Sequence, residues 1–539
     1  MELGPLCSYA FAGGRAPAQK KVGKKSSNDG KTSSKQKQKQ QQPKAAAAAT
    51  TATTASRVLV EVPRQQTSEL FYITTAINYT NGPPHIGHAY EGITTDIIAR
   101  YHRTYGRIVE FLTGTDEHGT KIAQTAENRT ELLKTASPKE IEALEKKWKM
   151  QLNGKKIIEP IDICDHYAAG FKRLNVALSV DSDKFIRTTE DYHKKTAQAL
   201  FSKCLARGDI YLGQYKGWYN VKEEQFVTPQ EAEATEFKDP ASGVPYEWRE
   251  EPSYYFRMGN YQAQLLEHIT KNPGFIQPEK HRNLIKKRLE DDKLLDLSIS
   301  RHISKLKHGV PLPNDKEHVM YVWFDALTNY ISGLGWPSAK ADKFFPTCTH
   351  IIGKDILWFH CVIWPCMLMS GEVPLPKTIF GHGWVLDKHG KKMSKSIGNV
   401  VDPWDVVAKF PLDTLRLYLA RETTYGNDLR FSIESLVNLN NSELADTLGN
   451  LVNRLTKLAK GQVPDVAVTE SGTKLPFNIA GVKADVDACF AEYNLKGATE
   501  VILTALRDTN KWIADAKPWT IKDKVGGGSR CYLSFAQHI

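Results

Sequence analysis

The 539-residue sequence contains only eight cysteines, and no two of them form a CxxC pair. They stand at positions 7, 164, 204, 348, 361, 366, 489 and 531. This spacing gives no disulfide framework and no cysteine-rich zinc knuckle, which favours a reducing compartment. Residues 190–318 hold a single cysteine, Cys204. We therefore expect no structural zinc.

Long hydrophobic runs are also missing. A membrane-spanning helix needs roughly 18 or more consecutive apolar residues. The apolar stretch at residues 351–369 is interrupted by Lys354, Asp355 and His360. Hydrophobic residues nevertheless make up 41% of the chain. We expect no membrane partner, and cores for roughly three or four domains.

Acidic residues are scarce at the N-terminus. Residues 1–57 contain eleven lysines and arginines but only two acids, Glu2 and Asp29. Since the whole chain carries a net charge of +11, the rest of the chain after residue 57 is nearly neutral. A nucleic-acid partner must therefore be argued from local basic patches. The composition, rich in Lys, Gln, Ser, Ala and Thr, predicts a disordered basic tail over residues 1–66. The tail fits an organellar transit segment, or alternatively a solvated extension that promotes RNA binding.

The sharpest local pattern is a strand-to-helix junction around residues 83–88, Pro-Pro-His-Ile-Gly-His. Residues 70–76 form a short apolar run of the kind found in buried parallel strands. From about Pro84 to Tyr101, apolar residues recur every three or four positions. This spacing predicts an amphipathic helix that begins near the proline.

The two histidines of this junction, His85 and His88, are expected on the first helical turn, facing the same way. Unpaired amides and the positive end of the helix dipole lie there, which suits a phosphate group. Gly87, between them, has no side chain to hinder a flat ligand that approaches the backbone.

A second strand is predicted at residues 109–113, and the polar residues Asp116, Glu117 and His118 follow it. Strand, helix and strand with polar residues at the strand end are typical of a nucleotide-binding parallel sheet. The three side chains are then expected in the ligand crevice. A simple turn with a helix cap is the alternative.

Later segments repeat this arrangement. Residues 190–318 have weak periodicity and several turn signals, which indicates an inserted α+β module. Strands are predicted again at residues 319–324 and 350–355, each followed by a helix with aromatic or histidine side chains. Aromatic residues and a carboxylate at strand ends suit a ligand with a soft apolar side chain and an ammonium group. Ordinary packing is the alternative for each residue alone.

A lysine-rich loop is predicted at residues 390–399, Gly-Lys-Lys-Met-Ser-Lys-Ser-Ile-Gly-Asn. Its lysines and hydroxyls can move onto a polyphosphate and neutralise charge on a leaving group. The spacing differs from the GxxxxGK[ST] of a P-loop. A solvated basic loop is the alternative.

The chain after about residue 431 is predicted to be a helical bundle. Five leucines at alternating steps of four and three mark one helix: Leu444, Leu448, Leu451, Leu455 and Leu458. Asn450, Arg454 and Trp519 can hydrogen-bond to and stack on unpaired bases of an RNA loop. Ordinary helix surface is the alternative.

Two motifs together carry a resemblance. His85-Ile86-Gly87-His88 and, about 300 residues later, Lys392-Met393-Ser394-Lys395-Ser396 are similar to the two signatures of the class I aminoacyl-tRNA synthetases. Segments 76–79, 113–119, 321–326 and 352–356 resemble the methionyl-tRNA synthetases in particular. The resemblance runs from about residue 70 to 520 and omits an insertion near residues 139–160.

The resemblance implies an α/β fold: a Rossmann-type doubly wound parallel sheet with an inserted connective module and a C-terminal helical bundle. The expected parts are a tail (1–66), the first half of the catalytic domain (67–189), the module (190–318), the second catalytic half (319–430) and an anticodon-binding bundle (431–539), shorter than the family's.

The implied reaction activates methionine with ATP to methionyl adenylate, then esterifies the terminal adenosine of tRNA(Met). The resemblance assigns catalysis to His85, His88, Lys392 and Lys395, and ATP binding to the same four with Gly87 and Ser394. It assigns methionine binding to Ile77, Tyr79, Asp116, Trp323, Tyr330, Asp355, His360 and Trp364, with Asp116 at the ammonium group. It assigns the anticodon to Asn450, Arg454 and Trp519.

Mg²⁺ is implied as the companion of ATP. The missing zinc knuckles make the chain similar to the zinc-free bacterial and mitochondrial type. With the basic tail, this predicts the mitochondrial matrix as the location, with the cytoplasm as the alternative. A monomer is expected. Two other functions compete with catalysis on tRNA: an inactive tRNA-binding relative, and an adenylyltransferase that acts on a smaller molecule.

Overall fold

The computed structural model describes residues 67–221, 225–227, 229–240, 242–393, 398–459, 476–517 and 519. The described chain divides into two compact units, one at residues 218–247 and the other formed by the rest. In the smaller unit, the end of β5 (Ile210–Asn220) pairs with β6 (Gln225–Val227), and α6 (Pro229–Ala234) follows. Val227, Ala232 and Tyr246 form its core.

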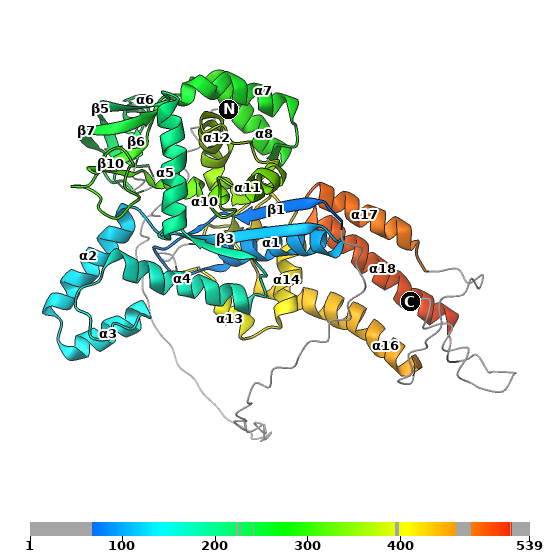
Figure 1. Ribbon diagram of the computed structural model, residues 1–539. Coiled ribbons are helices and arrows are strands. Elements are labelled where there is room, and N and C mark those ends of the chain that lie inside the picture. Colours follow the sequence, from blue (N-terminus) through cyan, green and yellow to red (C-terminus); the bar gives the residue numbers. More distant parts are fainter. Residues whose placement is uncertain are drawn as a thin grey trace, which may run out of the picture. The chain divides into compact units, whose positions relative to one another are not determined.

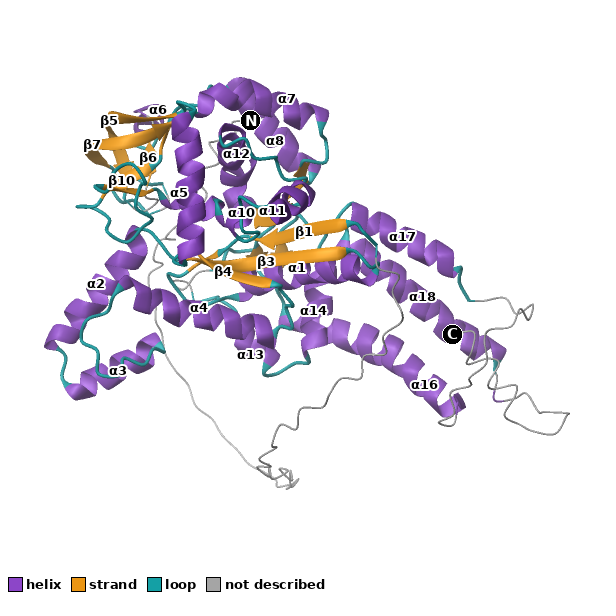
Figure 2. Ribbon diagram, viewed as in Figure 1, coloured by secondary structure: helices purple, strands orange, loops and turns teal. Residues whose placement is uncertain are grey.

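A parallel sheet lies at the centre of the larger unit (Figures 1 and 2). In the described part of the chain its strand order is β2-β3-β1-β12-β13-β8, and β4 pairs with β3. The strands are β1 (Leu70–Thr75), β2 (Asn78–Tyr79), β3 (Ile108–Asp116), β4 (Lys184–Arg187), β8 (Ile276–Gln277), β12 (Thr349–Gly353) and β13 (Thr378–His382). This confirms the strands predicted at residues 70–76, 109–113 and 350–355.

The two faces of the sheet bury different side chains of the same strand. Tyr72 of β1 belongs to one hydrophobic cluster and Ile73 to another, because successive side chains of a strand point to opposite faces. The Ile73 cluster lies under α1 (Ile86–Thr104), α13 (Pro403–Val407), α14 (Leu412–Arg421), α15 (Ile433–Leu439) and α18 (Leu495–Ala516).

The Tyr72 cluster is the larger core. It is covered by α5 (Asp191–Ala206), α7 (Gln262–Lys271), α8 (Glu279–Asp291), α9 (Val322–Leu327), α10 (Asn329–Ser332), α11 (Ala339–Phe344) and α12 (Trp364–Ser370). Helices on both faces of a parallel sheet confirm the predicted α/β class. Strand β8 pairs with β13, so part of residues 190–318 belongs to the central sheet. The domain boundaries themselves stay a prediction.

An arm of three helices adjoins the sheet: α2 (Thr120–Thr135), α3 (Pro138–Trp148) and α4 (Pro160–Ala177), which share a separate hydrophobic cluster. Smaller strand pairs complete the unit: β7 (Glu247–Phe256) with β9 (Leu297–Ser298), β10 (Ser300–His302) with β11 (His318–Met320), and β14 (Val385–Leu386) with β15 (Leu429–Arg430). No described helix is long and apolar enough to cross a membrane.

The strand predicted at residues 319–324 is wrong in part. Strand β11 ends at Met320 and pairs antiparallel with β10, outside the central sheet. The rest of the segment opens helix α9 at Val322. A short apolar run cannot by itself distinguish a buried strand from the start of a buried helix, so tertiary packing decided this one.

The C-terminal helices confirm the predicted bundle but correct its buried face. The leucine-rich segment is a π-helical stretch, η6 (Asn440–Gly449), followed by α16 (Asn450–Ala459). Glu443 and Thr447 are buried, whereas Leu448 is 38% exposed. A π-helix bonds residues five apart and therefore rotates the side chains out of the 3.6-residue phase. Helix α17 (Ile479–Ala491) packs on α18.

Candidate active site

The first candidate residues cap the start of helix α1. The helix begins at Ile86, so His85 is its N-cap rather than a helical residue. The Gly87 amide donates to Nδ1 of His85 at 3.1 Å, and the His85 amide donates to Nδ1 of His88 at 3.0 Å. The rings stack with centroids 3.7 Å apart. Both imidazoles therefore stand at the helix N-terminus, where anions are favoured.

Gly87 is required by this arrangement. A Cβ atom at Gly87 would lie 3.0 Å from two atoms of the His85 ring, tighter than nearly all real contacts. The glycine thus makes room for the capping imidazole. This gives the residue a role inside the protein, beside the expected approach of a ligand.

The lysine-motif segment lies against this helix start. The Ile86 amide donates to the carbonyl of Val401 at 3.3 Å, and Val401 and Met393 pack against the cluster that contains Ile86. The segment that follows the second signature therefore contacts the helix start of the first, about 300 residues away in sequence. Ser394 and Lys395 lie outside the described residues.

Lys392 is held by an aromatic residue that the sequence analysis did not single out. Its ammonium lies 4.1 Å from the centroid of the Trp384 ring, and the ammonium of Lys354 lies 4.2 Å from the same ring. Lys354 is also paired with Asp428 at 2.6 Å. Trp384 Nε1 donates to Asp355 at 3.3 Å. One indole thus organises two cations and a predicted methionine-site carboxylate.

The base of the lysine loop is closed by a short set of hydrogen bonds. Asn399 donates to Asp387 at 2.8 Å and to the Lys392 carbonyl at 3.3 Å. Asp387 also accepts from the backbone amides of His389 and Lys391, both at 2.9 Å. These bonds join Asp387 and Lys392, at the near end of the loop, to Asn399 at its far end.

A buried ion pair joins α1 to β13. His382 Nε2 lies 2.9 Å from Glu91, and His382 Nδ1 lies 2.8 Å from the Gly383 carbonyl. Burial opposes the charged imidazole, but the hydrogen bond and charge of Glu91 prevail and raise the pKa of His382. Since both ring nitrogens face oxygen acceptors, the imidazole donates at both. The pair fixes the helix that carries the histidine motif to the strand that precedes Trp384.

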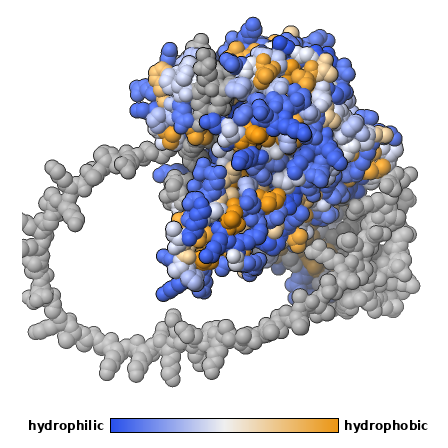
Figure 3. All heavy atoms as spheres, turned by 60° about the vertical axis from the view of Figure 1, so that its left-hand side comes forward, coloured by the Kyte–Doolittle hydropathy of each residue, from blue (hydrophilic) through white to orange (hydrophobic). Residues whose placement is uncertain are grey.

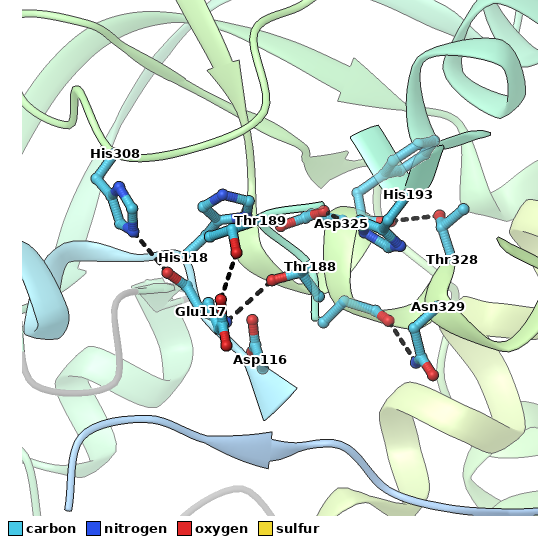
Figure 4. A network of polar contacts seen from close by, with 12 residues as sticks. Asp116, Glu117, His118, Thr188, Thr189, His193, His308, Asp325, Thr328 and Asn329 are labelled. Atoms are coloured by element: carbon cyan, nitrogen blue, oxygen red, sulfur yellow. Dashed lines mark hydrogen bonds and ion pairs between the residues drawn. The ribbon is translucent and has the colours of Figure 1, made fainter. Parts of the chain in front are cut away.

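The three polar residues at the carboxyl end of β3 separate into two groups (Figure 4). Asp116 is half-buried at the strand's carboxyl end, opposite Tyr79 in the β2–β3 register. Glu117 and His118 are buried. The crevice expected for all three therefore applies to Asp116, because the other two are used inside the protein.

Glu117 and His118 each hold a neighbouring segment. Glu117 accepts from Arg187 at 2.7 Å and also from Thr189. His118 Nδ1 lies 2.6 Å from Asp325 Oδ2, and His193 Nε2 lies 2.8 Å from Asp325 Oδ1. Asp325 is fully buried between these rings (Figure 4). Burial opposes its charge, but the two histidines prevail and hold its pKa well below the usual range.

Four of the eight predicted methionine residues lie in one aromatic cluster of the large core. Trp323 stacks on Phe359 with ring centroids 3.6 Å apart, and its ring lies 6.5 Å from that of His360. The Tyr330 hydroxyl bonds to His360 Nε2 at 2.6 Å. Trp364, fully buried, lies 6.0 Å from Tyr330. These four predicted residues are thus brought together.

His360 is neutral in this aromatic cluster. Its Nδ1 faces the Ile356 carbonyl at 3.0 Å, which can only accept, so Nε2 is the acceptor of the Tyr330 hydroxyl. Burial lowers the pKa of His360 to about 4. A neighbour that the sequence did not indicate, His350, accepts from Trp364 Nε1 at 3.3 Å and contacts the Tyr330 ring at a centroid distance of 4.1 Å.

The remaining methionine candidates lie outside this aromatic cluster. Ile77 packs against the same large cluster, while Tyr79 packs against the cluster beneath α2. Asp355 is exposed and reaches the site through Trp384. The candidates thus lie at the carboxyl ends of β1, β3 and β12, where parallel sheets bind ligands.

Two of the RNA-binding candidates, Asn450 and Arg454, lie on α16, which neighbours α18. Glu443 bonds to Arg507, Thr447 to Asn510, and Arg454 to Asn510. From the first pair to the second, the residue number rises on both helices, so η6 runs parallel to α18. Asn450, Arg454 and Trp519 are exposed, and Trp519 follows the end of α18.

Comparison with known proteins decides the family. The model of the class I tRNA synthetases (M) matches residues 71–153, 147–236 and 228–456. The chain is 41% identical over 477 residues to a methionine–tRNA ligase of Brucella suis, covering 86% of this chain and 87% of the relative. It is 42% identical over 460 residues to that of Thermotoga maritima, covering 84% and 68%.

The chain belongs to the class I methionyl-tRNA synthetase family. A solved structure agrees: Mycobacterium tuberculosis methionyl-tRNA synthetase in complex with methionyl-adenylate, at a TM-score of 0.73 and 36% identity, covering 87% of this chain and 88% of that one. The Rossmann-type sheet predicted for this family is thereby confirmed.

Sequence reasoning missed several residues of this synthetase site. Trp384, His382, Glu91, His193 and His350 have no motif of their own. One signal could have found two of them: His382 is the last residue of strand β13 and Trp384 follows it closely, at the strand end where ligand contacts gather. Glu91 and His193 lie within helices and are recognised only by their partners in space.

Proposed function

We propose that the site between β1, β3, β12 and β13 joins methionine to ATP, releases pyrophosphate from methionyl adenylate, and passes the methionyl group to the terminal adenosine of tRNA(Met). The hydrogen bond between the Ile86 amide and the Val401 carbonyl supports the proposal, because Val401 closely follows the lysine motif and Ile86 belongs to the histidine motif. The methionine carboxylate attacks the α-phosphorus, and the bond to the leaving pyrophosphate breaks.

Each residue group has a place in this reaction. His85 and His88 stabilise the charge on the pentavalent α-phosphate, and Gly87 allows close approach. Lys392, Lys395 and Ser394 hold the departing pyrophosphate from the other side. Catalysis is then positioning and charge stabilisation, without a side-chain general base.

The substrate amino acid is held beside the triphosphate. Asp116 pairs with its ammonium group. The side chain enters the pocket of Trp323, Tyr330, His360 and Trp364, and Ile77, Tyr79 and Asp355 border it. The neutral pocket favours an uncharged thioether, since a charged side chain would lose its hydration there.

Mg²⁺ enters with ATP in this proposal. Among the described residues, no group of three or more His, Cys, Asp or Glu could hold a metal ion. The metal would therefore be carried by the phosphates, where it neutralises charge on the triphosphate. We further propose the zinc-free type, because residues 190–318 have one cysteine and its thiol is buried in the main core.

The proposed tRNA contacts are Asn450, Arg454 and Trp519, which would read the anticodon. The proposed location is the mitochondrial matrix, with the cytoplasm as the alternative, and the proposed state is a monomer. The basic, acid-poor N-terminus supports the matrix. Imaging a reporter fused to residues 1–66 tests it: a cytoplasmic signal would contradict the matrix assignment.

Methionine-dependent exchange of pyrophosphate into ATP tests the activity. Exchange by the folded protein is expected with methionine and not with leucine. Absence of exchange would favour an inactive tRNA-binding relative. Exchange without transfer to tRNA(Met) would favour an adenylyltransferase for a smaller molecule.

A further inference from the structure

The end of α3 and the loop that follows it are unusually basic. Residues 146–156 contain five lysines and no acid: Lys146, Lys147, Lys149, Lys155 and Lys156. The family model matches up to residue 153 and starts again at residue 147, so its alignment breaks within this loop. We call residues 146–156 the basic loop.

Four acidic residues nearby are already engaged in hydrogen bonds or ion pairs. Glu140 accepts from the Ser137 amide at 2.8 Å and caps α3. Glu145 accepts from the Leu152 amide at 2.6 Å. Asp162 pairs with Lys155 at 2.6 Å, and Asp165 with Arg187 at 2.6 Å. The carboxylates around the loop thus leave most of its lysines without a counter-charge.

Four lysines of the loop remain directed to solvent. Lys146, Lys147, Lys149 and Lys156 are exposed. Within the part of the chain that the structure describes, their ammonium groups make no ion pair or hydrogen bond. Figure 3 brings forward the side of the molecule on which α2 and α3 lie in Figure 1, and its surface is largely hydrophilic.

The backbone of the loop is anchored. Met150, Leu152 and Ile158 are buried in the cluster beneath α2 and α4. Lys149 and Asn153 adopt positive φ angles of 53° and 51°, which makes the chain turn tightly between these anchors. An ordered frame that presents several unpaired cations costs less entropy on binding a polyanion than a flexible tail does.

A shallow hollow lies between the loop and α4. Its lining includes Lys149, Lys155 and Arg173, together with the carboxylates of Asp162 and Asp165. Both carboxylates are paired with other cations, as described above. Lys149 and Arg173 therefore leave the hollow with uncompensated positive charge, which suits a phosphate group.

Helix α4 connects this loop with the catalytic histidines. The helix starts at Pro160, directly after the loop, and the ring of Phe171 lies edge-on to His88 at 5.0 Å. Eleven residues of helix span roughly 16 Å. Phosphates of one strand of a duplex repeat every ~3.4 Å. The loop is therefore only a few nucleotides from a 3′ end seated at the active site.

We propose that the basic loop binds the sugar-phosphate backbone of the tRNA acceptor strand near its 3′ end. The proposal rests on the proposed function, since the 3′ adenosine must reach the active site. Lysines on a backbone position the RNA without reading its sequence. Such contacts release counterions and make affinity depend on salt.

The test compares K149Q/K156Q with a matched control, K343Q/K377Q. The control removes two exposed lysines next to the amino ends of strands β12 and β13, at the opposite edge of the sheet. Neither pair belongs to the catalytic or methionine-binding machinery. Glutamine keeps a polar, unbranched side chain, somewhat shorter than that of lysine, and removes the positive charge.

For K149Q/K156Q we expect unchanged pyrophosphate exchange, because that reaction needs no tRNA. The kcat/KM for tRNA(Met) in aminoacylation should fall roughly three- to tenfold, and the slope of log affinity against log salt should become shallower by about 1 to 2. The control should change neither quantity.

An unchanged kcat/KM for tRNA and an unchanged salt slope in K149Q/K156Q would overturn the proposal. Equal losses in the test and control variants would also overturn it, because they would show a general charge effect. If the wild-type protein showed no pyrophosphate exchange, the proposed function itself would be contradicted. The two failures are therefore distinguishable.

Discussion

The ammonium of Lys392 lies over the ring of Trp384, 4.1 Å from its centroid. Lys392 is the first lysine of the second signature, and Trp384 follows strand β13. A cation–π contact of this kind contributes roughly 0.5–1 kcal/mol when exposed and about 2 kcal/mol when desolvated. Trp384 therefore holds the near end of the lysine loop next to the site of the triphosphate.

Replacing this ring should impair adenylate formation. W384A is expected to lower kcat/KM for ATP in pyrophosphate exchange by roughly 2- to 30-fold, the range set by the energy of the contact. W384F should retain most of the activity, because phenylalanine keeps the ring face. W248A, at an exposed position, is the control. Equal losses in W384A and W384F would contradict a role for the ring face.

His88→Ala should slow adenylate formation far more than it weakens methionine binding. Loss of one group that stabilises transition-state charge costs roughly 10²- to 10³-fold in rate. The dissociation constant for methionine, measured by fluorescence quenching, should change less than about threefold. Equal losses in rate and binding would show that the residue stabilises ground and transition states alike.

Trp519→Ala and Arg454→Ala should affect tRNA selectively. Loss of base stacking costs roughly 1–3 kcal/mol, so kcat/KM for tRNA(Met) should fall roughly 5- to 150-fold in Trp519→Ala. Pyrophosphate exchange should be unchanged in both variants. Lys457→Ala, exposed on the same helix as Arg454, is the control. Unchanged aminoacylation by Trp519→Ala would remove this residue from the anticodon site.

Asp325→Asn should destabilise the fold around the methionine pocket. The carboxylate accepts from His118 and His193 in a fully buried site. Removing one partner of a buried pair costs roughly 3–5 kcal/mol of unfolding free energy. Ser332→Ala, which removes one hydrogen bond of His193, should cost about 1 kcal/mol. Urea unfolding measures both, and similar small costs would contradict a structural role for the charge.

The stability of the protein should fall in mild acid. Burial lowers the pKa values of His281, His308 and His360 to about 4 each. The unfolded chain titrates these groups near pH 6.5, so between pH 6.5 and about 4 it binds more protons than the folded chain. The contribution of these three histidines to the unfolding free energy is therefore fully present above pH 6.5. It decreases as the pH falls through this window.

Urea unfolding midpoints measured between pH 7.5 and 4.5 test this dependence. The variant H308Q removes one of the three groups and should show a shallower decrease. A midpoint that is constant from pH 7.5 to 4.5, or an H308Q profile identical to that of the wild type, would contradict the assignment of these histidines as neutral and buried.

The sequence was most informative where one local pattern has one physical solution. The apolar run at residues 70–76 became strand β1, and the 3.6-residue pattern after it became α1. The histidine and lysine signatures identified the family because two specific strings occurred in order. The ambiguous run at residues 319–324 shows the limit, because apolar character alone suits a strand or a helix.

The fate of polar residues could not be read in the same way. Asp116, Glu117 and His118 are adjacent, yet Asp116 is half-buried at the strand end while Glu117 and His118 are buried. Asp325, more than 200 residues away, is the hydrogen-bond partner that offsets the cost of burying His118. The phase of the bundle helix was likewise shifted by η6, which no spacing of leucines revealed.

By itself, the sequence determined the α/β class, the order of the motifs along the chain and the family. These depend on short-range periodicity and on short strings of residues. Only the tertiary structure decided that His85 caps a helix, that Trp384 carries Lys392, and that Glu91 and His382 join α1 to β13. The physical reason is that such pairs gain their energy from desolvation and proximity, which exist only after distant segments have packed together.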